Sequence, residues 1–130
     1  VVTSDKCYDN RGWLWPYRES DQLGGHDPYS ASKAAAELVV AGYRNVPGMT
    51  GAPLATARAG NVIGGGDWSA HRLLPDMMRA FANRNPVTLR MPSAVRPWQH
   101  VLDVLKGYLL LAERLAGPEG HLFASAWNFG

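Results

Sequence analysis

The chain has 130 residues, 46% of them hydrophobic and 18% charged, and a formal net charge of +2. This length and composition suit one modest globular core, and the mild charge without a basic run argues against a nucleic acid or a membrane surface as partner. The single cysteine, Cys7, rules out an intramolecular disulfide and fits a cytoplasmic setting.

Segments with strand and helix patterns alternate along the chain, which predicts an α/β fold with a mostly parallel sheet. Residues 1–4 (VVTS) are typical of the carboxyl end of a buried strand, and residues 7–27 of a long aromatic surface loop. Asp27 and Pro28 have the pattern of a helix N-cap and a first helical residue, and this helix should end near Asn45.

The second half of the chain continues the alternation. We expect a strand at 52–64 that ends in the glycine-rich turn GGGDW, a helix at 72–84, a short strand at 87–91, an amphipathic helix at 100–116 and a strand at 126–130. The apolar face of the last helix should consist of Val101, Leu105, Tyr108, Leu109 and Ala112. Both ends of the chain fall within predicted strands and it begins without methionine, so we expect a fragment of a longer protein that is inactive alone.

Two titratable side chains stand four residues apart at the start of the first helix. Tyr29 and Lys33 share a helix face, so both polar ends can reach one site. An ammonium beside a phenol stabilises the phenolate, which can take the proton of a sugar hydroxyl while hydride leaves the carbon. A Tyr and a Lys at this spacing are more often two ordinary surface residues, so the neighbouring motifs must decide.

The neighbouring motifs favour a site. Ser4 lies at the end of the first predicted strand, and ligands of parallel sheets bind beyond the carboxyl ends of strands. The chain also contains YSASK at 29–33, RAGNVIGGGDW at 58–68, LLP at 73–75 and RPWQHVLD at 96–103. In this order, the motifs resemble those of the extended short-chain dehydrogenase/reductase family, the nucleotide-sugar epimerases and dehydratases.

This resemblance implies the C-terminal part of a Rossmann-like, doubly wound parallel sheet plus part of a small substrate-binding lobe. Residues 1–63 would form the C-terminal half of the NAD-binding domain. Residues 64–99 would be a segment that binds the nucleotide sugar, and residues 100–130 would be a helix and strand that return to the Rossmann core.

The residues after Ser4 indicate a particular branch of the family. A lysine replaces the usual glutamate, giving Ser4, Asp5 and Lys6, which resembles the 4,6-dehydratases that convert CDP-glucose to CDP-4-keto-6-deoxyglucose. The resemblance implies that Ser4, Tyr29 and Lys33 catalyse oxidation at C4, with Tyr29 and Lys33 also binding the cofactor NAD. Asp5 and Lys6 would be the acid/base pair for loss of water across C5 and C6, before hydride returns to C6. A solvated Asp5–Lys6 pair at a strand end is the structural alternative.

The substrate side rests on the same resemblance. Asn61 and Arg96 match the family residues that hold the nucleotide diphosphate, and a guanidinium fork suits phosphate geometry. For Arg96, an ordinary surface salt bridge is the alternative. No cysteine or histidine cluster has zinc spacing, so no metal is expected.

Several alternatives remain at this stage. Enzymes of this kind are commonly homodimers or higher homo-oligomers, which the sequence does not prove. Another epimerase, or a 4,6-dehydratase for a dTDP-, UDP- or GDP-sugar, is the main rival. A non-catalytic nucleotide-binding relative, or an inactive fragment, is the rival from a different class.

Overall fold

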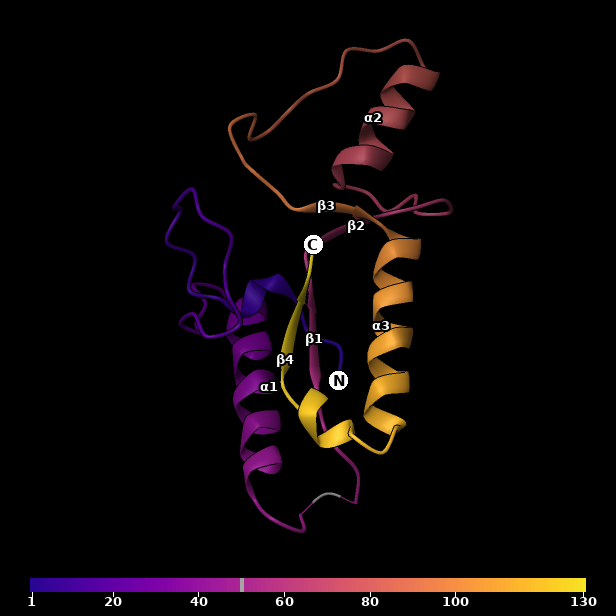
Figure 1. Cartoon of the computed structure of the whole chain (residues 1–130). Coiled ribbons are helices and arrows are strands. Elements are labelled where there is room, and N and C mark those ends of the chain that lie inside the picture. The colour runs from indigo at the N-terminus through magenta and orange to yellow at the C-terminus, as the bar shows by residue number, and fades with distance from the viewer. Residues whose placement is uncertain (50) are drawn as a thin grey trace.

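The computed structural model describes residues 1–49 and 51–130 and confirms the α/β fold with parallel strands (Figure 1). In chain order, its elements are the 3-10 helix η1 (Asp5–Cys7), α1 (Pro28–Asn45), β1 (Thr56–Ala59), β2 (Asn61–Ile63), α2 (Leu73–Ala82), β3 (Trp98–His100), α3 (Val101–Ala116), the 3-10 helix η2 (Gly120–Phe123) and β4 (Ala126–Phe129).

The central sheet is formed by β1 and β4, which run parallel with Ala57 opposite Trp127. On the other side of β1, Val2 forms an isolated parallel bridge to Ala57. A second parallel sheet, β2 with β3, lies beyond the carboxyl end of β1 (Figure 1). Three parallel segments therefore end at one edge of the central sheet, next to the second sheet.

The helices α1 and α3 lie on opposite sides of the central sheet (Figure 1). On one side, Glu37 of α1 accepts a hydrogen bond from the Thr56 hydroxyl of β1 at 2.7 Å. On the other side, the ring of Tyr108 in α3 packs edge-on against that of Phe129 in β4, with ring centres 5.0 Å apart. The sheet is thus covered on both faces, as expected for parallel strands.

Two predicted strands differ in extent from the observed ones. Residues 1–4 contribute only the bridge at Val2, because the chain turns into η1 directly after Thr3. The strand expected at 52–64 is interrupted at Gly60, so that its two halves belong to different sheets. A side chain at Gly60 would collide with Pro97, so this glycine permits the close approach of the segment that leads into β3.

The strand predicted at 87–91 does not form; β3 forms instead at residues 98–100. A strand needs a hydrogen-bonded neighbour, and β2 pairs with 98–100. The segment VTLRM has the local pattern of a strand, but within residues 1–49 and 51–130 it finds no partner and stays irregular. Sequence alone did not show which segment would reach β2.

The apolar face predicted for α3 is partly wrong. Leu105 and Leu109 are 47% and 71% exposed, whereas Val104 is 4% exposed. The helix is turned so that Gly107 and Tyr108 face Phe129 of β4. The apolar residues surround much of this helix, so periodicity did not single out the buried stripe.

Gly107 offers a test of this packing. A Cβ at Gly107 would lie 2.5 Å from Cε1 and 2.6 Å from Cδ1 of Phe129. Alanine gains about 1 kcal/mol of helix propensity, but we expect displacement of the ring to make Gly107→Ala destabilising by about 1–3 kcal/mol. Gly42 of α1 has nothing within 4 Å of an added Cβ, so Gly42→Ala should stabilise by about 0.5–1 kcal/mol. Urea unfolding of both full-length variants measures the contrast, and equal effects would contradict the packing.

The long loop at 7–27 is anchored at its base. Tyr8 forms an antiparallel bridge with Leu23, and its ring stacks on that of Tyr17 with centres 5.0 Å apart. The Trp13 ring lies 5.3 Å from the same Tyr17 ring. Aromatic contacts of this kind each stabilise by about 0.5–1.5 kcal/mol beyond their buried area. Nδ2 of Asn128 in β4 donates to the Tyr17 carbonyl at 2.9 Å, which holds the loop close to the carboxyl end of that strand.

Candidate active site

The first turn of α1 presents Tyr29 and Lys33 together. Asp27 caps the helix, because its carboxylate accepts hydrogen bonds from the Ser30 amide at 3.0 Å and the Ser30 hydroxyl at 2.6 Å. These hydrogen bonds lower the pKa of Asp27. Tyr29 is 56% exposed, and Nζ of Lys33 lies 5.5 Å from the centre of its ring. The two side chains thus face one accessible region.

Ser4, Asp5 and Lys6 follow the segment that pairs with β1. The Thr3 amide donates to the Ala57 carbonyl at 2.9 Å, which fixes this segment on the sheet. The Ser4 hydroxyl donates to Oδ1 of Asp5 at 3.1 Å and accepts from the Lys6 amide at 3.1 Å. Ser4 is buried, Asp5 is half-buried and Lys6 is exposed. The residues proposed as acid and base therefore stand in different environments.

The first turn of α1 and the segment that carries Ser4, Asp5 and Lys6 lie beside each other because η1 packs against α1. Lys6 is close enough to Asp27, the cap of α1, to contribute to the lowering of its pKa. Among residues 1–49 and 51–130, no hydrogen bond joins Ser4 to Tyr29 or Lys33. The structure thus gathers the candidate catalytic residues at one end of α1 without bonding them to one another.

The second sheet carries Asn61 and Arg96. Asn61 is the first residue of β2 and lies opposite Trp98, whose amide donates to the Arg96 carbonyl at 3.0 Å. Arg96 is half-buried, and within the described residues its guanidinium makes one hydrogen bond, a long one of 3.5 Å to the Val95 carbonyl. The β2–β3 pairing therefore brings Asn61 and Arg96 near each other, beyond the carboxyl end of β1.

A buried ion-pair cluster lies between α1 and β1, and sequence reasoning missed it. Nη2 of Arg58 pairs with Oε2 of Glu37 at 2.7 Å, with 4% and 2% of the side chains exposed. The Thr56 hydroxyl donates to the same oxygen at 2.7 Å, and the Thr3 hydroxyl donates to Oε1. We refer to these four residues as the ion-pair cluster. The available signal was the spacing of Glu37, four residues after Lys33 in an otherwise apolar run.

Both charges of the cluster are favoured despite their burial. Burial alone raises the pKa of Glu37, but hydrogen bonds from Arg58, Thr3 and Thr56 outweigh it and hold the pKa below its usual range. Burial alone lowers the pKa of Arg58, but hydrogen bonds to Glu37 and Tyr8 raise it above its usual value. The pair is therefore ionised in the folded protein.

Arg58 extends the cluster to the loop and to β4. Its Nη1 donates to the Tyr8 hydroxyl at 2.7 Å and to the Glu19 carbonyl at 3.0 Å. The Tyr8 hydroxyl donates to Oδ1 of Asn128 at 2.6 Å, and Nδ2 of Asn128 donates to the Tyr17 carbonyl at 2.9 Å. One guanidinium thus connects the helix, the central sheet and the aromatic loop.

Cys7 provides a chemical test of how η1 packs. Its side chain is 0% exposed, and burial raises its pKa to about 11, although the Arg58 charge acts in the opposite direction. At about pH 8 the thiol is protonated, so we expect slow alkylation by iodoacetamide in the folded full-length protein and fast alkylation after denaturation. Timed labelling with peptide mass spectrometry measures the rate. Rapid labelling of the native protein would contradict the packing of η1 against α1.

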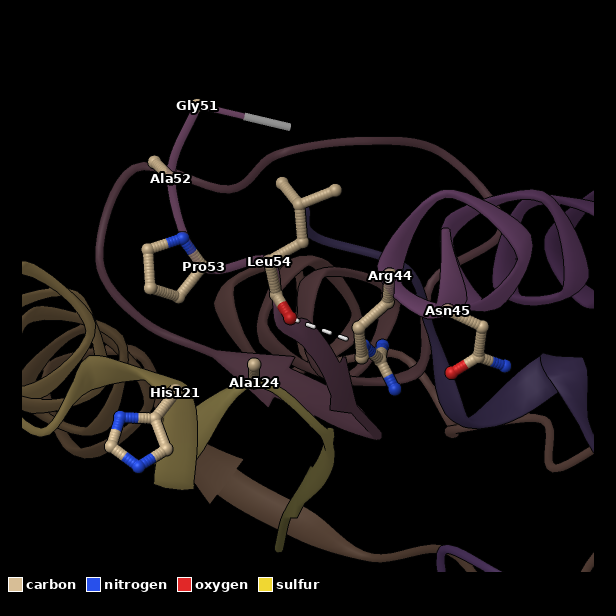
Figure 2. A pocket seen from close by; sticks show the side chains of 8 residues that line it. All are labelled: Arg44, Asn45, Gly51, Ala52, Pro53, Leu54, His121 and Ala124. Atoms are coloured by element: carbon tan, nitrogen blue, oxygen red, sulfur yellow. Dashed lines mark hydrogen bonds between the residues drawn. The ribbon is translucent and has the colours of Figure 1, made fainter. Parts of the chain in front are cut away.

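A surface depression of about 510 Å³ lies beside Arg44 and Asn45 (Figure 2). These two residues end α1, whereas Tyr29 lies in its first turn. The residues that line the depression are Arg44, Asn45, Gly51, Ala52, Pro53, Leu54, His121 and Ala124. Nε of Arg44 donates to the Leu54 carbonyl at 3.1 Å across it. The depression shares no residue with the candidate site.

Two further findings concern the described part of the chain alone. None of its helices combines the length and apolarity needed to cross a membrane. Within the same residues, no three His, Cys, Asp or Glu side chains converge in a group able to hold a metal ion.

The parallel sheet covered by helices on both faces, with a Tyr/Lys pair at its carboxyl edge, is the arrangement of a Rossmann-like α/β fold. Residues 2–128 match the family model described as the NAD dependent epimerase/dehydratase family, and the chain belongs to this family. The family predicted from the sequence motifs is thereby confirmed.

Individual relatives agree with this family. The chain is 54% identical over 135 aligned residues to CDP-glucose 4,6-dehydratase of Salmonella typhimurium, covering 99% of this chain and 37% of that protein. The structure of DesIV, a dTDP-glucose 4,6-dehydratase from Streptomyces venezuelae with NAD and TYD bound, has a TM-score of 0.77 and 25% identity, covering 99% of this chain and 37% of that one. The dTDP-glucose 4,6-dehydratase of Bacillus anthracis in complex with NAD shares the fold, with a TM-score of 0.78, 24% identity and coverage of 99% and 39%.

The similarity to the Salmonella enzyme confirms the branch of 4,6-dehydratases indicated by Ser4, Asp5 and Lys6 as the one this chain resembles. The chain spans 37% of the length of that relative and of DesIV.

Proposed function

We propose that this chain is the catalytic part of an NAD-dependent enzyme that converts CDP-glucose to CDP-4-keto-6-deoxyglucose. The observation that carries the proposal is the pairing of Tyr29 and Lys33 in the first turn of α1, beside the η1 segment that bears Asp5 and Lys6. The 54% identity to the Salmonella CDP-glucose 4,6-dehydratase supports the choice of base and sugar.

The residues present fit NAD as the cofactor. Lys33 has no carboxylate partner within residues 1–49 and 51–130, and the Tyr29 side chain is 56% exposed. An ammonium and a phenol held together in this way suit a ribose hydroxyl and a reacting sugar hydroxyl. Tyr29 and Lys33 would hold NAD, which would supply the hydride acceptor for oxidation at C4 and the hydride donor for reduction at C6.

Oxidation at C4 requires loss of the proton from the 4-hydroxyl. Tyr29, as the phenolate, takes this proton, and the Lys33 ammonium stabilises the phenolate charge. The hydroxyl of Ser4, which donates to Asp5 in this structure, would donate to the sugar oxygen and orient it. Deprotonation by Tyr29 leaves the electron pair that forms the C4 carbonyl.

Elimination of water follows from the ketone. The carbonyl at C4 acidifies the proton on C5, so a base of moderate strength can remove it. Asp5 and Lys6 divide these roles: one takes the C5 proton, and the other protonates the C6 hydroxyl as the C6–O bond breaks and a C5–C6 double bond forms. Reduction at C6 and reprotonation at C5 complete the 4-keto-6-deoxy sugar.

Asn61 and Arg96 hold the nucleotide diphosphate in this proposal. The support is that β2 and β3 place them near each other at the sheet edge, with the Arg96 guanidinium making one long hydrogen bond among the described residues. The fork of an arginine can donate to two phosphate oxygens at once. With the diphosphate bound by Asn61 and Arg96, the sugar would lie between the diphosphate and Tyr29.

We also propose a cytoplasmic homodimer or higher homo-oligomer for the full-length protein. The support is an apolar exposed face on α1, where Leu38, Val39 and Tyr43 are 62%, 58% and 49% exposed. The unpaired thiol of Cys7 is compatible with a reducing compartment. Light scattering coupled to size-exclusion chromatography measures the assembly, and a monomeric mass would contradict it.

The direct test is a substrate panel. The full-length gene product that contains this chain would be incubated with NAD and, separately, with CDP-, dTDP-, UDP- and GDP-hexoses, and products identified by mass spectrometry. Loss of one water from CDP-glucose alone is expected. Isomerisation without water loss, or dehydration of another nucleotide sugar, would overturn the specific proposal within the same family. The same panel with the Lys6→Glu variant measures whether Lys6 determines which nucleotide sugar is dehydrated.

A further inference from the structure

Glu37 lies on the same face of α1 as Tyr29 and Lys33, because the three residues are spaced by four along the helix. Exposure decreases along this row of three residues: Tyr29 is 56% exposed and Glu37 is 2% exposed. A helix of this length turns as one body. Any rotation of α1 that moved the Glu37 carboxylate would therefore also move the phenol.

The Glu37 carboxylate is held by two other segments of the chain. From β1, Nη2 of Arg58 and the hydroxyl of Thr56 each donate to Oε2 at 2.7 Å, and from the first residues the Thr3 hydroxyl donates to Oε1. Thr3 directly precedes Ser4. One buried carboxylate thus joins the helix that carries the phenol to the segment that carries the serine.

We infer that the Glu37–Arg58 ion pair is a positioning device: its hydrogen bonds fix the rotation of α1 and thereby set where Tyr29 and Lys33 stand relative to Ser4. The inference rests on the proposed function. Glu37 and Arg58 contact no reacting group and are positioning residues.

Stability alone is a weak explanation for a buried pair of charges. Well-packed apolar residues of similar volume often hold a fold as firmly as a buried ion pair does. Apolar contacts, however, have no preferred direction, whereas each hydrogen bond on Glu37 does. Arg58 is fixed in turn by the Tyr8 hydroxyl at 2.7 Å and the Glu19 carbonyl at 3.0 Å. The directionality of the cluster is what an apolar replacement would lose.

The first test is the double variant Glu37→Leu/Arg58→Met in the full-length enzyme. We expect a thermal midpoint close to that of the wild type and an unchanged KM for the nucleotide sugar. We expect kcat to fall by about 10- to 100-fold, since a misplacement of about 1 Å can cost on the order of 100-fold. Amide hydrogen exchange should become faster in the peptide covering residues 28–33, which is a readout independent of turnover. A folded double variant with wild-type kcat and wild-type exchange would overturn the inference.

Substitution of Thr56 gives a second test that leaves both charges in place. It tests the positioning role even if the double variant does not fold. Thr56→Val keeps the shape of the side chain and removes its hydrogen bond to Glu37, whereas Thr56→Ser keeps the hydroxyl. Loss of one such bond should lower kcat by roughly 2- to 10-fold for the valine variant, without a change in KM. The serine variant should recover most of the loss. Equal kcat values in the two variants would contradict a positioning role.

Failure of the proposed function gives a different result. If the wild-type enzyme dehydrates none of the nucleotide sugars, the proposed function is wrong, and hydrogen exchange still decides the inference. Faster exchange of residues 28–33 in Thr56→Val or in the double variant supports it, and unchanged exchange overturns it.

Discussion

Tyr29→Phe in the full-length enzyme is expected to lower kcat for CDP-glucose by about 10²- to 10⁴-fold, the usual contribution of a positioned acid or base. The change removes one oxygen and keeps a ring that is 56% exposed, so the fold should be retained. Without the phenolate, the proton of the 4-hydroxyl has no acceptor when hydride leaves C4. Steady-state kinetics at saturating NAD, with thermal unfolding in parallel, measures the effect.

The matched control is Tyr43→Phe. Tyr43 lies near the other end of α1 and is 49% exposed, so the same atom is removed from the same helix at a comparable exposure. We expect its kcat to stay within about twofold of the wild type. Near-wild-type turnover by Tyr29→Phe would contradict the proposal that Tyr29 takes the proton of the 4-hydroxyl.

Glu37→Ala should destabilise the full-length protein by about 3–5 kcal/mol, because Arg58 would keep its charge in a buried site without a carboxylate to neutralise it. Only 4% of the Arg58 side chain is exposed, so bulk solvent does not screen the charge that is left behind. Thr3 and Thr56 would each lose an acceptor as well. Denaturant unfolding measures the change in the free energy of unfolding.

Glu113→Ala is the control for this prediction. Glu113 is an exposed carboxylate on α3, so the same truncation should change stability by no more than about 0.5 kcal/mol. Similar losses for the two variants would mean that the Glu37–Arg58 pair is not buried in solution as it is in this structure.

The same pair also predicts a dependence on pH. The pKa of Glu37 is lower in the folded protein than its ordinary 4.5, so the unfolded state binds the proton more readily. The stabilisation is therefore complete above about pH 4.5 and is lost as the pH falls through the lower, folded value. Glu37→Gln, which has no such titration, should lose stability less steeply in acid than the wild type does.

The helix at 28–45 and its Tyr/Lys pair could be predicted from sequence because the signals are local. An aspartate cap, a proline in the first position and a spacing of four are contained within a few residues. The same holds for the ends of α2 and α3, which differ from the predicted ones by two residues or fewer.

The features that sequence did not predict depend on contacts between distant segments. The break at Gly60 follows from the approach of Pro97, and β3 follows from its pairing with β2. The ion-pair cluster is the clearest case: charged residues are almost never fully buried unless paired, so Glu37 and Arg58 read as surface residues until the fold brings them together.

The measurement that tests the central claim most directly uses CDP-glucose carrying deuterium at C4. The full-length enzyme would be incubated with this substrate and NAD, and the product examined by mass spectrometry and NMR. Oxidation at C4 followed by reduction at C6 predicts a product that has lost one water and carries the deuterium at C6. A product of unchanged mass, or one that has lost water but carries no deuterium at C6, would contradict the account.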